Sequence, residues 1–576
     1  MRLLDSRRLT GPSLLLDEPG AILEVALDGA EPEPAIAAWR AALDRLRGAL
    51  AWSGAAVARA HRDGLSLAFP APIDVLYAAT EVNEAAWQMA AAALGSEPAP
   101  EPLAAAVTRL ETAIEEERKP WLQALAAEAN RRGVTLLADD KRISVGLGVG
   151  SRAWPEEETP RVLDRIPWRG IHDVPVALVT GTNGKTTSVR LLGAIAAAAG
   201  RVAGVTSTDG VTVHDEVVAE GDYSGPNGAR TVLRDRRVEI AMLELARGGI
   251  LRRGLALPRA QVALVTNVAN DHLGEYGIFD LDALTEVKLV VAKAVPPEGR
   301  VTLNADDPRL LARGAHLRCR VIWFTLDAEH PALLPHRARG GEACVLEGDE
   351  LVFYRGRDRE VMARLAEVPL AFGGAARHNV ANALGVIGVA VALALPAAAI
   401  RAGLRTFETS HASNPGRANV WRLQGVSALV DFAHNPHGLV ALAQLAASMP
   451  ARRRGIVIGQ AGDRDDEAIR ELARAAAGVR PDRVFLKEME YYLRGRERGA
   501  VSDLLADEMG RSGVAHAAIE RCDSELEAVR AALAWAREGD LLVLTTHTQR
   551  DEVIALLESL SRTGWRPGSP ILMPPA

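Results

Sequence analysis

Apolar residues recur along this chain in three successive patterns. The first covers residues 1–165, where short strand-like runs are mixed with Ala-rich helical stretches. The clearest predicted elements there are Ala21–Leu27, Leu65–Phe69, Pro34–Trp52 and Glu81–Leu94. Thr80 stands where it would cap the last of these helices. The segment Trp154–Trp168, rich in Pro and charge, is predicted to be a linker.

The second pattern begins at Val174 and alternates continuous apolar runs with helices. The run Val176–Thr180 is followed by a glycine loop and an apolar helix, Thr186–Ala199. Further buried strands are predicted at Val238–Leu243, Val262–Thr266, Val301–Leu303 and Val321–Phe324. Apolar strands that alternate with helices are typical of a parallel sheet covered on both faces.

The third pattern starts near His411 and again alternates strands with helices. Its strands are predicted at Ala428–Phe432, Gly455–Ile458, Arg483–Leu486 and Leu541–Thr545. Its helices are predicted at Leu439–Ser448, Asp466–Ala477, Val501–Gly510 and Ser524–Glu538. We therefore expect a multidomain α/β protein with an α+β domain at residues 1–165 and α/β domains at residues 172–408 and 409–576.

Composition narrows the class of protein. The 576 residues carry a net charge of -7, which argues against a nucleic-acid binder. Three scattered cysteines favour a reducing compartment such as the cytoplasm. The first residues do not form a signal peptide. The uncharged stretch Ala383–Ile400 is interrupted by glycines and a proline, so we expect a buried helix with its exit turn and no membrane partner.

The strongest chemical signal is the loop Thr180–Thr187, with the sequence TGTNGKTT between a strand and a helix. Gly181 and Gly184 let backbone N–H groups approach phosphate oxygens, and the helix N-terminus favours an anion. Val179 stands where the usual Walker pattern has its first glycine. Lys185 is one of only six lysines, so its amine is expected to matter.

This short loop resembles that of the Mur ligase family, and the resemblance extends over residues 172–576. It implies a central P-loop ATPase domain and a Rossmann-like C-terminal domain. It also implies a reaction in which ATP phosphorylates a carboxylate and an amine then attacks the acyl phosphate, with Mg²⁺ as the metal. The loop residues implied to bind nucleotide are Gly181, Thr182, Asn183, Gly184, Lys185, Thr186 and Thr187.

Other catalytic and metal-binding residues are implied by the same resemblance. Glu244 follows a buried strand, at the edge of the sheet where ligands usually bind, and would hold Mg²⁺ together with Thr186. His272, in an Asp-His pair with Asp271, would be a metal or phosphate-site residue. Lys288 would be carbamylated and would bind metal, although a helix lysine that snorkels from an apolar face is the alternative.

The remaining nucleotide-binding residues lie in four short segments. Asn304 and His378 resemble adenine-site residues of the family, as do Asn379 and Asn382, whose amides would share one helix face. In the third block, Arg417 is implied to meet ATP phosphates across a domain cleft, Asp431 to contact the ribose and His434 to lie nearby. The catalytic set implied by the resemblance is thus Lys185, Glu244, His272, Lys288 and Arg417.

Three strings are similar more narrowly to cyanophycin synthetases within this family: Gly221–Pro226, Ala246–Gly254 and Leu493–Gly499. The first twelve residues also resemble the start of those enzymes. An ATP-grasp domain normally lies between these parts, and the chain has no room for one, so alternating polymer growth is not implied. Three further loops follow strands. Gly459–Arg464 is either a cleft loop or a plain loop, and Lys487–Glu490 either binds an amino acid or acidic peptide or is a solvated basic loop. Thr545–Arg550 has no assigned role.

The resemblance thus implies an ADP-forming ligase that joins an amino acid to a carboxylate of an amino acid or peptide, and it is compatible with a homo-oligomer. A glutamate-chain or cell-wall-precursor ligase would share the fold and use another acceptor. A non-catalytic ATP-binding partner of a ligase is the third hypothesis. Acceptor, donor amino acid and the role of the first domain stay open at this point.

Overall fold

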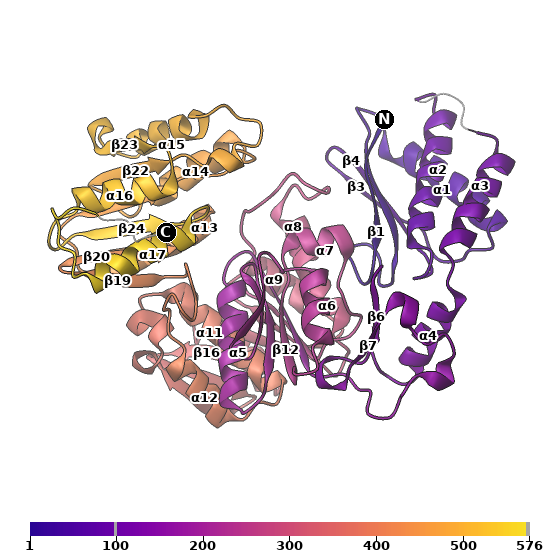
Figure 1. The fold of residues 1–576 in the computed structure, drawn as a ribbon, viewed down its shortest axis with the longest axis horizontal. Helices are drawn as coiled ribbons and strands as arrows, with labels where there is room; N and C mark the ends of the chain where they lie inside the picture. The colour runs from indigo at the N-terminus through magenta and orange to yellow at the C-terminus, as the bar shows by residue number, and fades with distance from the viewer. Residues whose placement is uncertain (97–100, 572–576) are drawn as a thin grey trace.

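The computed structural model describes residues 1–96 and 101–571, so the last five residues of the predicted third domain lie outside it. The chain builds four sheets in sequence order (Figure 1). The N-terminal and C-terminal parts stand on either side of the large middle sheet, and the two outer parts are separated in the view of Figure 1.

The N-terminal part packs helices on one antiparallel sheet of order β1-β2-β4-β3. Its strands are β1 Arg2–Leu9, β2 Gly20–Ala26, β3 Val57–His61 and β4 Gly64–Pro70. Its helices are α1 Pro32–Ala49, α2 Leu76–Ala93 and α3 Leu103–Glu117. Trp39, Trp87 and Phe69 fill the core between sheet and helices. An α+β arrangement follows from the alternating burial of these strands and the apolar faces of the helices.

The predicted cap of helix α2 was wrong. The helix begins at Leu76, and Thr80 lies inside it with its Oγ1 donating to the carbonyl of Tyr77 at 2.7 Å. The carboxylate of Glu117 instead accepts the backbone N–H groups of Tyr77 and Ala78, at 3.1 and 2.8 Å. A distant side chain thus satisfies the orphan donors that a local cap would serve, so the helix can start earlier.

The predicted linker was wrong at its beginning. Helix α4 Pro120–Arg131 leads into a small antiparallel sheet made of β5 Leu136–Ala138, β6 Arg142–Val145 and β7 Arg152–Pro155. Trp154 pairs with Ile143 within this sheet. The following turns, η2 Glu156–Glu158 and η3 Leu163–Arg165, lead to Trp168, whose side chain packs with Trp154 on one apolar cluster. Pro and charge therefore mark the end of a strand here and not a free linker.

The middle part is an eleven-stranded sheet of order β11-β10-β9-β12-β8-β13-β14-β15-β16-β17-β18. Its strands are β8 Val176–Thr180, β9 Ala203–Thr206, β10 Gly210–Val213, β11 Glu216–Glu220, β12 Ile240–Glu244, β13 Val262–Val265, β14 Arg300–Asn304, β15 Arg320–Thr325, β16 Glu342–Glu347, β17 Glu350–Arg355 and β18 Asp358–Arg364. The neighbours in the run β9-β12-β8-β13-β14-β15-β16 of this order pair in parallel, as predicted. The two antiparallel hairpins at the edges were not predicted.

Helices cover both faces of this sheet. One face packs against α5 Lys185–Ala198, α11 Arg377–Ala392 and α12 Ala397–Thr406. The other packs against α6 Pro226–Arg234, α7 Arg247–Arg253, α8 Leu281–Leu289, α9 Pro308–Gly314 and α10 Leu333–Ala338. Successive residues of β8 alternate between the two cores, with Val176 and Leu178 in one and Ala177 and Val179 in the other. This alternation explains why the strand is a continuous apolar run.

The uncharged stretch near residue 390 is a buried helix and its exit turn, as predicted. Helix α11 is almost wholly buried against the sheet, and the chain turns at Pro396 into α12. Within residues 1–96 and 101–571, none of the helices has both the length and the apolar character needed to cross a bilayer.

The C-terminal part is a six-stranded sheet of order β19-β20-β24-β21-β22-β23. Its strands are β19 Asn419–Leu423, β20 Val426–Asp431, β21 Arg454–Ile458, β22 Arg483–Lys487, β23 Ile519–Cys522 and β24 Leu541–Thr545. Its helices are α13 Pro436–Ser448, α14 Asp466–Ala477, α15 Ala500–Arg511, α16 Glu525–Trp535 and α17 Arg550–Arg562. All strands but β19 pair in parallel, so the predicted second α/β unit is confirmed, while β19, β23 and α17 were not foreseen.

Close packing of α12 on α5 depends on Gly403. A Cβ built at this position would lie 2.8 Å from the Cα of Ile195 in α5. Gly403→Ala is therefore expected to lower the free energy of unfolding by about 1–3 kcal/mol, because the two helices must move apart. The melting temperature of the variant measures this. Gly48→Ala is the matched control, a glycine in helix α1 with open space around it, and should leave stability unchanged or raise it. Equal effects of the two changes would contradict the packing argument.

Candidate active site

The predicted phosphate loop lies between β8 and α5. Gly184 occupies the N-cap of α5 with φ +86°, a conformation that favours glycine. A Cβ at Gly184 would lie 2.2 Å from Oδ1 of Asn382, and a Cβ at Gly181 would lie 1.9 Å from Oγ1 of Thr266. Lys185 Nζ donates to the carbonyl of Thr182 at 2.9 Å, which folds the side chain back over the loop. The loop therefore presents unpaired helix N–H groups and an amine at one point.

A buried carboxylate faces this loop. Thr186 Oγ1 donates to Oε2 of Glu244 at 2.9 Å and lies 3.3 Å from Oγ1 of Thr208. Glu244 is completely buried at the end of β12, and burial raises the pKa of its carboxyl. Its second oxygen, Oε1, is buried without a hydrogen-bond partner among the described residues. An orphaned carboxylate oxygen next to a hydroxyl is an arrangement that suits a hard cation such as Mg²⁺.

Lys288 lies beneath the same loop. Helix α8, which carries it, has Asp280 as its N-cap, and the carboxylate of Asp280 accepts the backbone N–H of Ala283. Nζ of Lys288 donates to the carbonyl of Gly181 at 2.8 Å, and the side chain is buried. Burial, helped by the nearby charge of Lys185, places the pKa of this amine well below its ordinary value. The interpretation as a snorkelling surface lysine is therefore wrong.

A cavity of about 140 Å³ joins the phosphate loop to the C-terminal part. Among its lining residues are these predicted ones: Thr182, Asn183, Gly184, Lys185, Thr186, Thr187, Glu244, His378, Asn379, Asn382, Arg417, Asp431 and His434. Residues separated by more than 200 positions thus meet in one place. Burial lowers the pKa of His378 to about 4, so that its ring is neutral near pH 7.

Four predicted residues lie outside the lining of this cavity: Gly181, His272, Lys288 and Asn304. Gly181 and Lys288 are joined by the hydrogen bond from the Lys288 amine to the Gly181 carbonyl. Asn304 ends β14 and donates to the carbonyl of Thr266 at 3.0 Å, while its Oδ1 accepts the N–H of Asp306. The structure therefore does not bring Asn304 to the cavity wall, because its amide is used to join two neighbouring strand ends.

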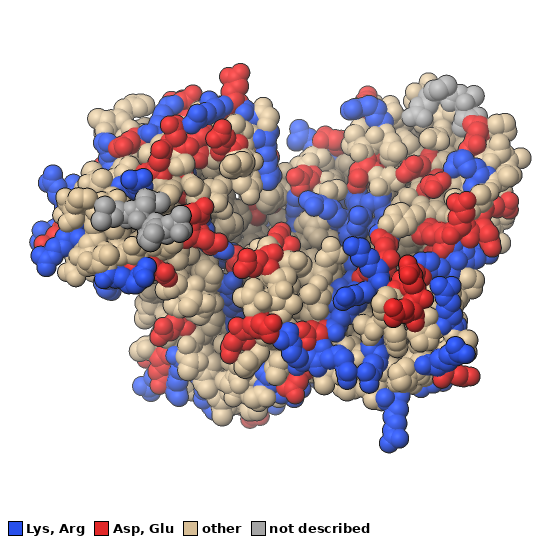
Figure 2. All heavy atoms as spheres, in the orientation of Figure 1, with Lys and Arg blue, Asp and Glu red and all other residues tan. Residues whose placement is uncertain are grey.

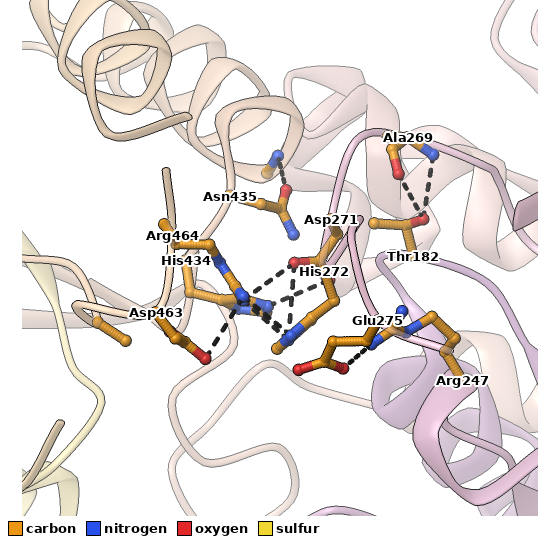
Figure 3. A network of polar contacts seen from close by, with 12 residues as sticks. Thr182, Arg247, Ala269, Asp271, His272, Glu275, His434, Asn435, Asp463 and Arg464 are labelled. Atoms are coloured by element: carbon orange, nitrogen blue, oxygen red, sulfur yellow. Dashed lines mark hydrogen bonds and ion pairs between the residues drawn. The ribbon is translucent and has the colours of Figure 1, made fainter. Parts of the chain in front are cut away.

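His272 belongs to a separate polar cluster between the middle and C-terminal parts (Figure 3). His272 adopts φ +54° and lies with Asp271 opposite His434, and the three offer ligand atoms within 4.8 Å of one another. The guanidinium of Arg464 reaches across to within 2.9 Å of the His272 ring nitrogens and 3.4 Å of Asp271. Burial lowers the pKa of His272 to about 4. A neutral imidazole has a free nitrogen that is able to bind a metal ion or to accept a hydrogen bond from a donor at the phosphate site.

Arg417 and Asp431 come to the cavity from the C-terminal part. The guanidinium of Arg417 lies 4.5 Å from the ring centre of Phe432. Asp431 accepts the backbone N–H groups of Ala418 and Ala433, both at 2.8 Å, and burial raises the pKa of its carboxyl. Asp431 therefore fixes the backbone directly after Arg417 and directly after Phe432.

Sequence reasoning missed several residues that join the two parts. The amides of Asn183 and Asn435 bond reciprocally across the cleft, at 3.0 and 3.1 Å, and Asn183 also reaches Nδ1 of His437 at 2.9 Å. Asn435 caps α13 through the N–H of Gly438, so the helix N-terminus positions this amide. The sequence Asn435-Pro436 has the pattern of a helix start, but nothing in the sequence indicates that the Asn435 amide bonds to Asn183.

A second cavity, of about 600 Å³, lies between the N-terminal part and the middle sheet. Residues 222–226 and the start of α7 form part of its walls, and among them are Ser224, Gly225, Ala246 and Gly249. Arg230, Arg252 and Arg253 also line it, and Lys and Arg side chains gather where these parts meet (Figure 2). Glu244 lines the first cavity and Ala246 the second, so one short loop connects the two.

The charges in this second cavity are unequally satisfied. Three of its carboxylates pair with cations: Asp140 with Arg8, Asp139 with Arg234 and Glu156 with Lys119. The other three, Asp74, Glu117 and Asp222, accept hydrogen bonds from neutral donors. By contrast, Nε of the nearly buried Arg230 has no hydrogen-bond partner in the described structure. Arg252 and Arg253 are exposed and form no ion pair within the described ranges. The cavity therefore offers guanidinium groups to an anion.

Comparison with known proteins identifies two domains. Residues 179–390 match the Mur ligase middle domain, and residues 416–547 match the Mur ligase glutamate ligase domain. Cyanophycin synthetase of Nostoc sp. is 40% identical over 62% of this chain and 39% of its own length. That of Synechocystis sp. is 38% identical over 68% of this chain and 45% of its own length. The chain thus spans less than half the length of these curated relatives.

A more distant relative is covered more completely. The UDP-N-acetylmuramoylalanine--D-glutamate ligase of Streptomyces coelicolor is 29% identical over 68% of this chain and 77% of its own length. The two matched family domains, residues 179–390 and 416–547, contain the middle and C-terminal sheets between which the first cavity lies.

The glycine that caps α5 provides a test of this site. Gly184→Ala is expected to weaken binding of the Mg–ATP predicted from the loop sequence at least tenfold, because the added Cβ collides with Asn382 and strains a positive φ. Isothermal titration calorimetry measures the change. Gly200→Ala at the other end of α5 is the control, since it shares a positive φ but has nothing within 4 Å. Equal loss in both variants would mean that the loop is not the nucleotide site.

Proposed function

Since the chain belongs to the Mur ligase family through its middle and glutamate ligase domains, we propose that it is an ATP-dependent, ADP-forming ligase. It joins an amino acid to a carboxylate of an amino acid or peptide through an acyl phosphate. Among its relatives, cyanophycin synthetases at about 40% identity favour an acceptor of the same kind. Three free cysteines agree with work in a reducing compartment such as the cytoplasm.

The observation that carries this proposal is the pair formed by Thr186 and Glu244 at the N-terminus of α5. The hydroxyl and the orphaned carboxylate oxygen together fit a divalent cation, for which Mg²⁺ is the proposed identity. Bound there, Mg²⁺ would offset the negative charge of the nucleotide phosphates. The glycine loop and Lys185 beside this pair support a site for nucleotide phosphates.

The chain's own residues supply position and charge. The N–H groups at the start of α5 and the amine of Lys185 would bind phosphate oxygens, and Arg417 would stabilise charge from the other side of the cleft. His378, Asn379 and Asn382 line the wall next to the loop, where the adenine is proposed to lie. Because phosphoryl transfer needs mostly positioning and electrostatics, these groups suffice for the step that activates the carboxylate.

Two further residues have proposed roles near the metal. Lys288 has an amine whose pKa is well below its usual range, and a neutral amine is the form that reacts with CO₂ to give a carbamate. Its buried position under the phosphate loop supports this role. His272, with Asp271 and His434, offers a second place for a cation or for the reacting carboxylate. Asp431 is proposed to contact the ribose.

The domains divide the work in this proposal. Residues 172–408 would bind ATP, and residues 409–576 would bring Arg417 and the amino acid. Residues 1–165 would help to bind the acceptor, because the second cavity lies where this part meets the middle sheet. Its free guanidinium groups favour an acceptor rich in carboxylates, and the loop from Glu244 to Gly249 leads from it to the phosphate site.

A second candidate keeps the chemistry and changes the acceptor. The match to a UDP-N-acetylmuramoylalanine--D-glutamate ligase over 77% of its length favours a cell-wall-precursor or glutamate-chain ligase. Two of the three strings that resemble cyanophycin synthetases, Gly221–Pro226 and Ala246–Gly254, contribute residues to the second cavity and favour an acidic peptide instead. A non-catalytic ATP-binding partner is disfavoured by the set Lys185, Thr186, Glu244 and Arg417 around one cavity.

The substrate class is tested by phosphate release from Mg–ATP across a matrix of amino acids and short Asp- or Glu-containing peptides. Release is expected only when an acidic peptide and one amino acid are both present. Lys185→Ala should lower the rate at least a hundredfold, because phosphate charge in the transition state loses its cation. Unchanged turnover in Lys185→Ala would refute the assigned site. Release with cell-wall precursors alone would favour the second candidate.

The acceptor cavity is tested separately. Arg253→Ala and Arg252→Ala should each raise the KM for the acidic acceptor about tenfold, since each removes a charge-assisted hydrogen bond of ~1.5–3 kcal/mol. The KM for ATP should not change. Arg318→Ala, an exposed arginine of the middle part that lies outside this cavity, is the control. A change in KM for ATP without one for the acceptor would contradict the assignment of this cavity.

A further inference from the structure

The loops that follow β22 and β24 in the C-terminal part are joined by one buried ion pair. Lys487, at the end of β22, donates to Glu525 at the start of α16 and to the carbonyl of Thr545 at the end of β24. Both charged side chains are completely buried. Burial opposes it, but the ammonium of Lys487 keeps the pKa of the Glu525 carboxyl below its usual range. The ion pair is therefore formed inside the domain and joins three strand and helix ends.

Glu525 also holds the turn that follows β24. Its carboxylate accepts the backbone N–H groups of His547, Thr548 and Gln549, at 2.7, 3.2 and 3.0 Å. Buried carboxylates with several backbone donors are well satisfied and rigid. The turn leads directly into helix α17, whose first residue is Arg550. The buried pair thus fixes the position from which Arg550 projects.

Arg550 crosses to the middle part. Its guanidinium pairs with Oδ1 of Asp209, 341 residues away, in the turn between β9 and β10. The other oxygen of Asp209 accepts from Arg190 of helix α5 at 2.9 Å. All three side chains are at most one-fifth exposed. Asp209 therefore joins the phosphate-loop helix to the C-terminal part.

The segment that carries Arg417 lies within this contact. Gly416 has φ +67°, and a Cβ there would lie 2.9 Å from Cδ of Arg550. Asn414 is buried and bonds with both Thr187 and Arg190 of α5, each at 3.3 Å. Arg550 and α5 thus brace the turn on both sides. Movement of Arg550 away from Asp209 would move Arg417 away from the cavity.

The contact gathers several charges. Burial favours a neutral Asp209, but the guanidinium groups of Arg417, Arg190 and Arg550 together hold the pKa of its carboxyl below the usual value. Arg550 also pairs with Asp551 at 3.1 Å. The phosphates of a bound nucleotide would meet Arg417 at the cavity, so closure of the cleft and the presence of nucleotide are expected to stabilise each other.

The cavity of about 140 Å³ at the phosphate loop is smaller than the ~300–1,000 Å³ typical of small-molecule sites. We therefore expect the middle and C-terminal parts to move apart when a nucleotide enters. The contacts across the cleft would break and re-form in each cycle. The Asp209 contact joins full charges from both parts beside Arg417, and Arg464 with Asp271 does so at the His272 cluster.

We propose that Asp209 and Arg550 form a latch that closes the C-terminal part onto helix α5 and so positions Arg417 at the nucleotide phosphates. Both are positioning residues, and Arg190 is the second arm of the latch. The inference rests on the proposed function. An isolated surface ion pair would contribute little to stability, so the role of this pair is to choose the closed arrangement.

The test is a double-mutant cycle with Asp209→Asn and Arg550→Ala in the full chain. Each single variant should lower kcat for phosphate release at least tenfold, and the double variant no more than Asp209→Asn alone, because that change already removes the partner of Arg550. Arg550→Lys should recover part of the rate, and the KM for the acidic acceptor should stay within twofold. Arg562→Ala, exposed at the other end of α17, is the control and should match the wild type. A larger loss in the double variant than in Asp209→Asn, or no loss in the singles, would overturn the latch.

A second measurement does not depend on ligase activity. Small-angle X-ray scattering of the full chain with saturating Mg²⁺ and a non-hydrolysable ATP analogue should give a larger radius of gyration for Arg550→Ala than for wild type and Arg562→Ala. Equal radii would overturn the latch even if the rates had fallen. If the wild type releases no phosphate with any substrate pair, the proposed function fails, and the scattering comparison alone decides on the latch.

Discussion

The hydrogen bond from Thr186 to the buried carboxylate of Glu244 is the contact on which the rest of the site depends. It joins the start of helix α5, which follows strand β8, to the end of strand β12, which pairs in parallel with β8. Because burial raises the pKa of Glu244, its second oxygen is costly to leave without a partner, and the cost favours a bound cation. Position and charge of the proposed phosphate site thus follow from one buried pair in a rigid sheet.

Contacts across the cleft are of two kinds with different consequences. The amides of Asn183 and Asn435 are neutral, so they align the two parts without a strong dependence on charge. The contacts of Asp209 with Arg190 and Arg550, and of Arg464 with Asp271, join charged groups. The neutral contacts align the two parts, and the charged contacts make closure of the cleft depend on charge. The buried pair of Lys487 and Glu525 belongs to neither, yet it determines where Arg550 begins.

Much of the fold could be predicted, because continuous apolar runs and helical periodicity are local properties of the chain. Strand β24 and helix α14 have the predicted bounds, and the phosphate loop lies where its glycines indicate. Contacts between distant positions could not be predicted. Glu117 replaces Thr80 as the group that satisfies the start of α2, and Asp209 finds Arg550 only after both sheets have formed. Asn304 was assigned by resemblance to the adenine site, whereas its amide bonds to the neighbouring strand end, which no pattern in the sequence reveals.

The central claim is that ATP phosphorylates the acceptor carboxylate at this cleft. The most direct measurement is to label both carboxylate oxygens of the acceptor with ¹⁸O and to analyse the phosphate released during turnover by mass spectrometry. An acyl phosphate keeps the attacking carboxylate oxygen on phosphorus when the amine displaces it, so the account predicts one ¹⁸O in each phosphate. Label in AMP, or in no phosphorus-containing product, would contradict it.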